Sequence, residues 1–151
     1  MQETFQITQT SRKLLSKLIE NLSLEQLTSI PSGFNNNIIW NIGHIIVVQQ
    51  MLVYHLSGVP MSIAADLVSK YKKGTQPQDV VTEDEVFYLK QLLFSTVKQT
   101  EVDYEAGLFK NFTEYTVMTG FVVKSVQDAI AFNYYHEALH TGVIMSLKKL
   151  V

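Results

Sequence analysis

The stretch His136-Glu137-Ala138-Leu139-His140, near the end of the chain, is the most informative part of the sequence. An α-helix has ~3.6 residues per turn, so residues four apart lie one turn apart on the same face. If this stretch is helical, the imidazoles of His136 and His140 point the same way and can share one metal ion. Imidazole nitrogen suits zinc, nickel, copper and iron(II). The stretch therefore predicts a helix that supplies two ligands of a metal site.

The same residues match the H-E-x-x-H signature of zinc peptidases, which find their third ligand downstream. Here the segment from Thr141 to Val151 contains no His, Asp or Glu, so a third ligand has to come from upstream. The peptidase interpretation is therefore disfavoured. Glu137 lies one residue off the ligand face and is expected to orient a neighbour or to face solvent. Spacing alone leaves a metal site and a pair of hydrogen-bonded core histidines equally open.

Two upstream histidines, His44 and His55, compete for the third ligand position. They face the same way on one predicted helix but lie ~16 Å apart along its axis, so only one can join the pair. His44 lies in the middle of the helix beside Asn41, among apolar neighbours, where a buried polar group needs a partner. His55 lies at the end of the helix, where capping or surface exposure explains it. The pattern favours His44.

Composition limits the possible functions. The 151 residues suit one domain, 1–151, and the apolar fraction of 46 % and charged fraction of 17 % are typical of globular proteins. A net charge of −2 predicts binding neither to nucleic acid nor to an acidic membrane surface. The chain has no cysteine, which excludes disulfides, thiolate ligands and a cysteine nucleophile. We see no secretory signal and no apolar stretch long enough to span a bilayer, so a cytoplasmic location is expected.

Hydrophobic periodicity and capping residues predict four main helices. Their expected extents are residues 2–22, from the asparagines at 35–37 to Leu56, from the capping residues 82–85 to about 104–107, and from Ser125 to the last turn. The longest connection runs from Met61 to Gln78 and includes a possible short helix, Ile63–Tyr71. Residues 108–123 are expected to form packed irregular chain with a short extended piece.

Two of the predicted helices have a recognisable apolar stripe. In the first helix the stripe is Ile7, Leu14, Leu18 and Leu22, with Ser11 on it and Arg12 on the other side. In the last helix the stripe is Ala129, Phe132, His136, His140, Val143 and Leu147. The two histidines are thus expected to face the core.

Two segments resemble the DinB-like superfamily of bacterial metal-binding proteins. They are Trp40-Asn41-Ile42-Gly43-His44-Ile45 and His136-Glu137-Ala138-Leu139-His140-Thr141-Gly142. The order of the helices and the long connection also agree. The resemblance implies an all-α, up-up-down-down four-helix bundle with the long connection between helices two and three. It also implies one divalent metal ion held by three histidines, here His44, His136 and His140.

The superfamily includes bacillithiol transferases and a mycothiol-dependent maleylpyruvate isomerase. The resemblance therefore implies a metal-dependent thiol S-transferase that uses zinc, nickel or iron and takes a low-molecular-weight thiol and a small electrophile. A chain without cysteine is compatible with this, since the cosubstrate would bring the sulfur. The alternatives are a non-catalytic, stress-related metal-binding bundle and a metal-dependent hydrolase. Lysines at 70, 72, 73 and 124 are candidates for docking an anionic thiol, although a solvated surface explains them equally.

Assembly into a symmetric homodimer is also expected. Similar helix bundles are dimers, and the third helix carries more apolar side chains than one core needs, among them Phe87, Tyr88 and Phe94.

Overall fold

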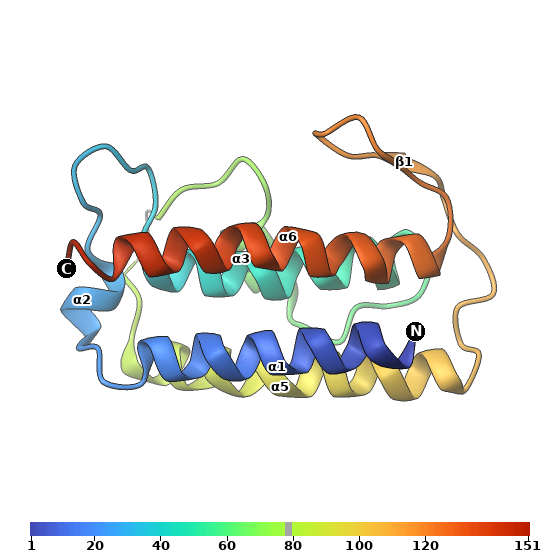
Figure 1. Cartoon of the computed structure of the whole chain (residues 1–151), viewed down its shortest axis with the longest axis horizontal. Coiled ribbons are helices and arrows are strands. Elements are labelled where there is room, and N and C mark those ends of the chain that lie inside the picture. Colours follow the sequence, from blue (N-terminus) through green and yellow to red (C-terminus); the bar gives the residue numbers. More distant parts are fainter. Residues whose placement is uncertain (78–79) are drawn as a thin grey trace.

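Four long helices lie side by side, with α3 and α6 in one layer and α1 and α5 in the other (Figure 1). The computed structural model describes residues 1–77 and 80–151. The long helices are α1 (Gln2–Ile19), α3 (Ile38–Gln50), α5 (Glu83–Glu105) and α6 (Val126–Leu147), and a π-helix, η1 (Met51–His55), continues α3 directly. The expected all-α fold is confirmed. None of the described helices is long and apolar enough to cross a membrane.

Shorter elements lie in the connections: α2 (Leu24–Thr28), α4 (Ala65–Tyr71), β1 (Tyr115–Thr116) and β2 (Val122–Val123). The long connection between α3 and α5 is confirmed, and α4 lies where a short helix was expected. The expected end of that connection, Gln78, lies outside the described residues. Strands β1 and β2 pair antiparallel as a small hairpin, which is the short extended piece predicted within residues 108–123.

The directions of the helices correct the expected up-up-down-down order. Helices α1 and α6 run one way, and α3 and α5 run the other (Figure 1). Cross-helix hydrogen bonds agree: Gln9 bonds Glu101 while Arg12 bonds Thr96, so α1 and α5 are antiparallel. An up-up-down-down bundle needs two long crossovers. Of the connections in the described parts of the chain, the one between α3 and α5 joins two helices that run the same way, so the order is up-down-down-up.

Side-chain caps begin the helices where the sequence predicted. The side chain of Asn37 accepts a hydrogen bond from the backbone of Trp40 at the start of α3. Thr82 and Ser125 cap α5 and α6 in the same way. Each cap satisfies a backbone N–H that the helix itself leaves unpaired. These starts set the positions of the histidines on α3 and α6.

The buried face of α1 differs from the predicted one. Ile7 and Leu14 are each 45 % exposed, whereas Arg12 is fully buried. The face that packs against the bundle consists of Phe5, Thr8, Arg12, Leu15 and Ile19. The prediction failed because it placed the charged Arg12 in solvent, although α6 supplies an ionic partner for it.

The buried face of α6 is also rotated from the prediction. Its fully buried centre includes Ile130, Glu137 and Ile144, and the predicted stripe residues Phe132, His136, His140 and Val143 are only half-buried. The histidines therefore lie at the border between the core and the surface. A metal ion held there would remain within reach of a ligand from solvent.

A buried polar layer divides the hydrophobic core. One apolar cluster includes Leu15 and Leu93, and a second includes Phe5 and Val97. Between them, along α1, lies Arg12 with its polar partners. This layer is level with His136, because its acidic member is the next residue on α6.

Close packing beside His44 depends on a glycine. A Cβ added to Gly43 would lie 2.5 Å from Cγ of Tyr71, so the tyrosine ring can rest on α3 only because this position is glycine. Gly142 on α6, by contrast, has nothing within 4 Å of an added Cβ. The two glycines form a matched pair for testing this contact.

We expect Gly43→Ala to lower the free energy of unfolding by about 1–3 kcal/mol, because the added methyl overpacks the Tyr71 contact. Gly142→Ala should raise it by about 0.5–1 kcal/mol, since alanine is the better helix former. Urea denaturation followed by circular dichroism measures both changes. A Gly43→Ala protein as stable as the wild type would contradict the described packing of Tyr71 on α3.

Candidate metal centre

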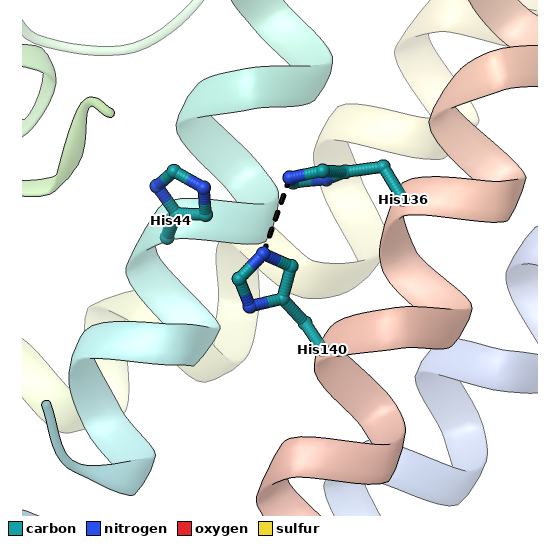
Figure 2. A group of neighbouring side chains, drawn as sticks. All are labelled: His44, His136 and His140. Atoms are coloured by element: carbon teal, nitrogen blue, oxygen red, sulfur yellow. Dashed lines mark hydrogen bonds between the residues drawn. The ribbon is translucent and has the colours of Figure 1, made fainter. Parts of the chain in front are cut away.

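Three histidines from two helices converge between α3 and α6. His44 projects from α3, and His136 and His140 project from successive turns of α6 (Figure 2). One ring nitrogen from each lies within 4.8 Å of the other two. The structure thus brings together the three residues named from the sequence, in an arrangement that can hold a metal ion.

The hydrogen bonds of Asn41 determine which nitrogen of His140 is free. The Asn41 amide donates from Nδ2 to the carbonyl oxygen of Asn37, at 2.7 Å, and to Oδ1 of Asn36, at 2.8 Å. Its Oδ1 therefore faces His140, whose Nδ1 lies 2.8 Å away. Because an amide oxygen only accepts, Nδ1 of His140 carries the proton. Nε2 is left with a lone pair directed toward the other histidines.

His44 is oriented by a backbone carbonyl in the same manner. Its Nδ1 lies 2.7 Å from the carbonyl oxygen of Tyr71, so Nδ1 donates and Nε2 keeps its lone pair. The His44 ring also stacks on Trp40, with ring centroids 4.6 Å apart. Metal-binding histidines commonly donate their second N–H to such a carbonyl or amide, which fixes the ring for its metal.

The distance between the two α6 histidines also suits a shared ion. Nε2 of His136 lies 3.2 Å from Nε2 of His140. Two imidazoles at ~2.0–2.1 Å from a tetrahedral zinc ion have nitrogens ~3.3 Å apart. Nδ1 of His136 is buried and has no hydrogen-bond partner among the described residues. These donor atoms fit a divalent ion that accepts imidazole.

The environment keeps the three imidazoles neutral. Burial, and then the proximity of His140 and His44, lower the pKa of His136 from 6.5 to about 3. Burial, followed by the proximity of His44, lowers the pKa of His140 to about 4. Burial also lowers the pKa of His44, against the opposing effect of its bond to Tyr71. Neutral imidazole is the form that binds metal, so protons do not compete for this site near pH 7.

Asn41→Ala is expected to weaken metal binding about 10–100-fold, the usual effect of removing a partner that orients a ligand. Asn41 is fully buried and its oxygen holds His140 in the ligating tautomer. Competition with a coloured chelator measures the affinity. The exposed Asn35 offers the matched control, since Asn35→Ala removes an amide from the loop that leads into α3. Equal affinities in the two variants would refute this role of Asn41.

The sequence of this chain also matches the model of a known protein family. The sequence model of the DinB superfamily matches residues 7–144. The chain belongs to the DinB superfamily. No curated protein matches it significantly. As a DinB-superfamily protein, it combines a helical bundle with a three-histidine cluster compatible with metal binding.

In this DinB-superfamily protein Glu137, which follows His136 on α6, does not face solvent. Glu137 is fully buried and forms a bidentate ion pair with Arg12, with Nη2–Oε1 and Nε–Oε2 distances of 2.7 and 3.0 Å. The amide of Asn133 donates a further bond to Oε1. A carboxylate engaged in this way cannot serve as the general base of a zinc peptidase, which counts against that interpretation of the motif.

Arg12 is the buried neighbour of the histidine cluster that the sequence interpretation placed in solvent. Its Nη1 also donates to the carbonyl oxygen of Leu93 and to Oγ1 of Thr96, so α1 is tied to both α5 and α6. A signal was present, because Arg12 continues the 3–4-residue spacing of Phe5, Thr8, Leu15 and Ile19. The ion pair fixes α6 directly beside His136.

The remaining candidates lie outside the cluster. His55 is exposed at the end of η1 and is not part of the three-histidine group. Lys70 forms an ion pair with Glu85, at 2.8 Å, and is half-buried. Lys72 and Lys124 are exposed.

Proposed function

We propose that this protein is a metal-dependent transferase that joins a low-molecular-weight thiol, of the bacillithiol type, to a small electrophile. The observation that carries the proposal is the convergence of three neutral imidazoles at the edge of the core. Three protein ligands leave at least one coordination position for a substrate. A divalent ion in this position, zinc, nickel or iron, would lower the pKa of a thiol that binds it, so that the sulfur reacts as thiolate.

The roles of the protein residues follow from their contacts. His44, His136 and His140 would hold the ion, while Asn41 and the carbonyl of Tyr71 keep the rings of His140 and His44 oriented. No cysteine competes for the electrophile, so the reacting sulfur belongs to the cosubstrate. In the reaction, the S–H bond breaks and an S–C bond forms, while the bond from that carbon to its leaving group breaks, as the C–Cl bond does in monochlorobimane, and the leaving group departs as an anion to solvent. The released proton passes to solvent, because the nearby carboxylate of Glu137 is occupied by Arg12.

The test uses purified protein loaded separately with zinc, nickel or iron(II), monochlorobimane, and a panel of thiols that includes bacillithiol, glutathione, cysteine and coenzyme A. We expect a metal-dependent increase in bimane fluorescence with at least one thiol, which is abolished in His136→Ala and retained in His55→Ala. Absence of any rate above the uncatalysed reaction with all thiols would overturn the proposal in favour of a non-catalytic metal-binding protein. Metal-dependent cleavage of p-nitrophenyl acetate without thiol transfer would instead indicate a hydrolase.

We further propose that the protein forms a symmetric homodimer through α5. Phe87 is 63 % exposed, and Tyr88 and Phe94 are each 41 % exposed, on this helix. Such side chains lose their contact with water when two copies pack together. Light scattering at micromolar concentration should give twice the chain mass of 17.2 kDa, and Phe87→Glu should return the monomer. A monomer mass for the wild type would contradict the proposal.

A further inference from the structure

The surface of α6 beside the histidines is apolar and uncharged. Tyr135 and Leu139 each precede one of the two histidines by one residue, and they are 47 % and 52 % exposed. Apart from the histidines, Glu137 is the only Asp, Glu, Lys or Arg between residues 129 and 147, and it is fully buried. A ligand that extends from the metal centre onto the exposed face of α6 would meet aromatic and aliphatic side chains there.

The β1–β2 hairpin extends this surface. It lies beside the first half of α6, and its tip points along the helix toward the middle of the bundle (Figure 1). The ring of Phe121 stacks on Phe132 of α6, with centroids 6.2 Å apart and planes at 7°. Phe132 in turn contacts Tyr135, at 5.7 Å between centroids. We call Phe121, Phe132 and Tyr135 the aromatic shelf.

The shelf is close to the candidate metal centre. Phe132 precedes His136 by four residues, so their Cα atoms are one helical turn, ~6 Å, apart on one side of α6. Phe121 remains 51 % exposed despite its stacking on Phe132. An aromatic group that extends from a metal-bound atom along α6 toward Phe132 would meet these rings, and offset or edge-to-face contacts between aromatic groups are favourable.

We propose that the aromatic shelf binds the uncharged aromatic part of the substrate while the reactive group lies at the metal centre. The inference rests on the proposed function and names the substrate class, an electrophile with an uncharged aromatic group. Anionic groups are disfavoured here, because the shelf would remove them from water without offering a partner. The electrophile, rather than the polar thiol, is therefore the occupant.

The test measures binding to the cobalt(II)-loaded protein and needs no turnover. Benzohydroxamate and acetohydroxamate carry the same metal-binding group and differ in a phenyl ring against a methyl group. Titration of each, followed by the visible absorption of cobalt, gives two dissociation constants. We expect benzohydroxamate to bind about tenfold more tightly, which corresponds to burial of roughly 55 Å² of additional apolar surface at ~25 cal/mol per Å².

Two variants test whether the preference for benzohydroxamate over acetohydroxamate comes from the aromatic shelf. Tyr135→Ser and Phe121→Ala should each reduce the benzohydroxamate preference to about threefold or less, with acetohydroxamate affinity and cobalt content unchanged. Tyr134→Ser is the matched control, because it removes an exposed tyrosine from α6 that is not part of the aromatic shelf. Tyr135→Ser keeps the test valid if the hairpin does not fold in Phe121→Ala, since Tyr135 is an exposed helical residue.

The outcomes separate this inference from the proposed function. Equal affinity for the two hydroxamates, or a preference that both shelf variants retain, overturns the inference and leaves the transferase proposal standing. A shelf-dependent preference in a protein without transferase activity supports the aromatic subsite and counts only against the proposed reaction. If a second copy of the chain covers the shelf, benzohydroxamate affinity will fall as dimer forms with rising protein concentration, and that result also overturns the inference.

Discussion

Glu137→Ala is expected to lower the free energy of unfolding by about 3–5 kcal/mol, the usual effect of removing one partner from a buried ion pair. Both side chains of the Arg12–Glu137 pair are fully buried. Without the carboxylate, the Arg12 guanidinium loses two hydrogen bonds and its counter-charge in a place that water does not reach. Urea denaturation followed at 222 nm measures the loss, provided that the slope with urea concentration is unchanged.

Two further variants test whether the loss of stability comes from leaving the buried charge of Arg12 unpaired. Lys13→Ala removes the exposed charge next to Arg12 and should change stability by less than about 0.5 kcal/mol. The double variant Arg12→Met/Glu137→Leu removes both charges and should recover much of the loss, because apolar residues of similar size often replace a buried pair. A loss below 1 kcal/mol in Glu137→Ala would show that Arg12 finds another partner or reaches solvent.

Sequence reasoning predicted the helices because their boundaries are set by local chemistry. The caps at Asn37, Thr82 and Ser125 each bond a backbone N–H three residues ahead, so the signal lies within one turn. The directions of the helices have no such local cause. They depend on which connections cross the length of the bundle, and the single long connection was compatible only with the up-down-down-up order.

The error in the face of α1 has a different physical origin. Arg12 is buried only because Glu137, 125 residues away in sequence, offers a carboxylate at the same level of the bundle. A charged side chain is almost never fully buried without such a partner, so the prediction placed Arg12 in solvent. Nothing near Arg12 in the sequence indicates where its partner lies. The two residues meet because of the register in which α1 packs against α6 in the folded protein.

The histidine cluster was more predictable than its surroundings. The spacing of His136 and His140 is a property of one helix, and the position of His44 among apolar residues implied a buried role. The bond from His140 to Asn41 spans 99 residues and depends on the register of α3 against α6. The stacking of Phe121 on Phe132 likewise depends on how the hairpin folds back over α6. Long-range packing of this kind leaves little local signal.

Replacing any one of His44, His136 and His140 with alanine is expected to abolish tight metal binding. One ring nitrogen from each lies within 4.8 Å of the other two, so loss of one histidine would leave at most two protein ligands for an ion. The affinity should fall by more than the ~10–100-fold that removal of a supporting residue such as Asn41 causes. Elemental analysis after dialysis of untagged protein against buffered zinc gives the occupancy, and chelator competition gives the dissociation constant.

His55→Ala is the matched control for these variants, since His55 is exposed and lies at the end of η1 on the same chain segment as His44. Zinc at ~1,000 times its dissociation constant should stabilise the wild type and His55→Ala by about 4 kcal/mol, because only the folded state binds the ion. The three ligand variants should show almost none of this stabilisation while their metal-free forms keep the helical signal. Full zinc occupancy in His44→Ala, or its loss in His55→Ala, would show that His44 is not the upstream ligand and that the tautomer fixed by the Tyr71 carbonyl does not serve metal binding.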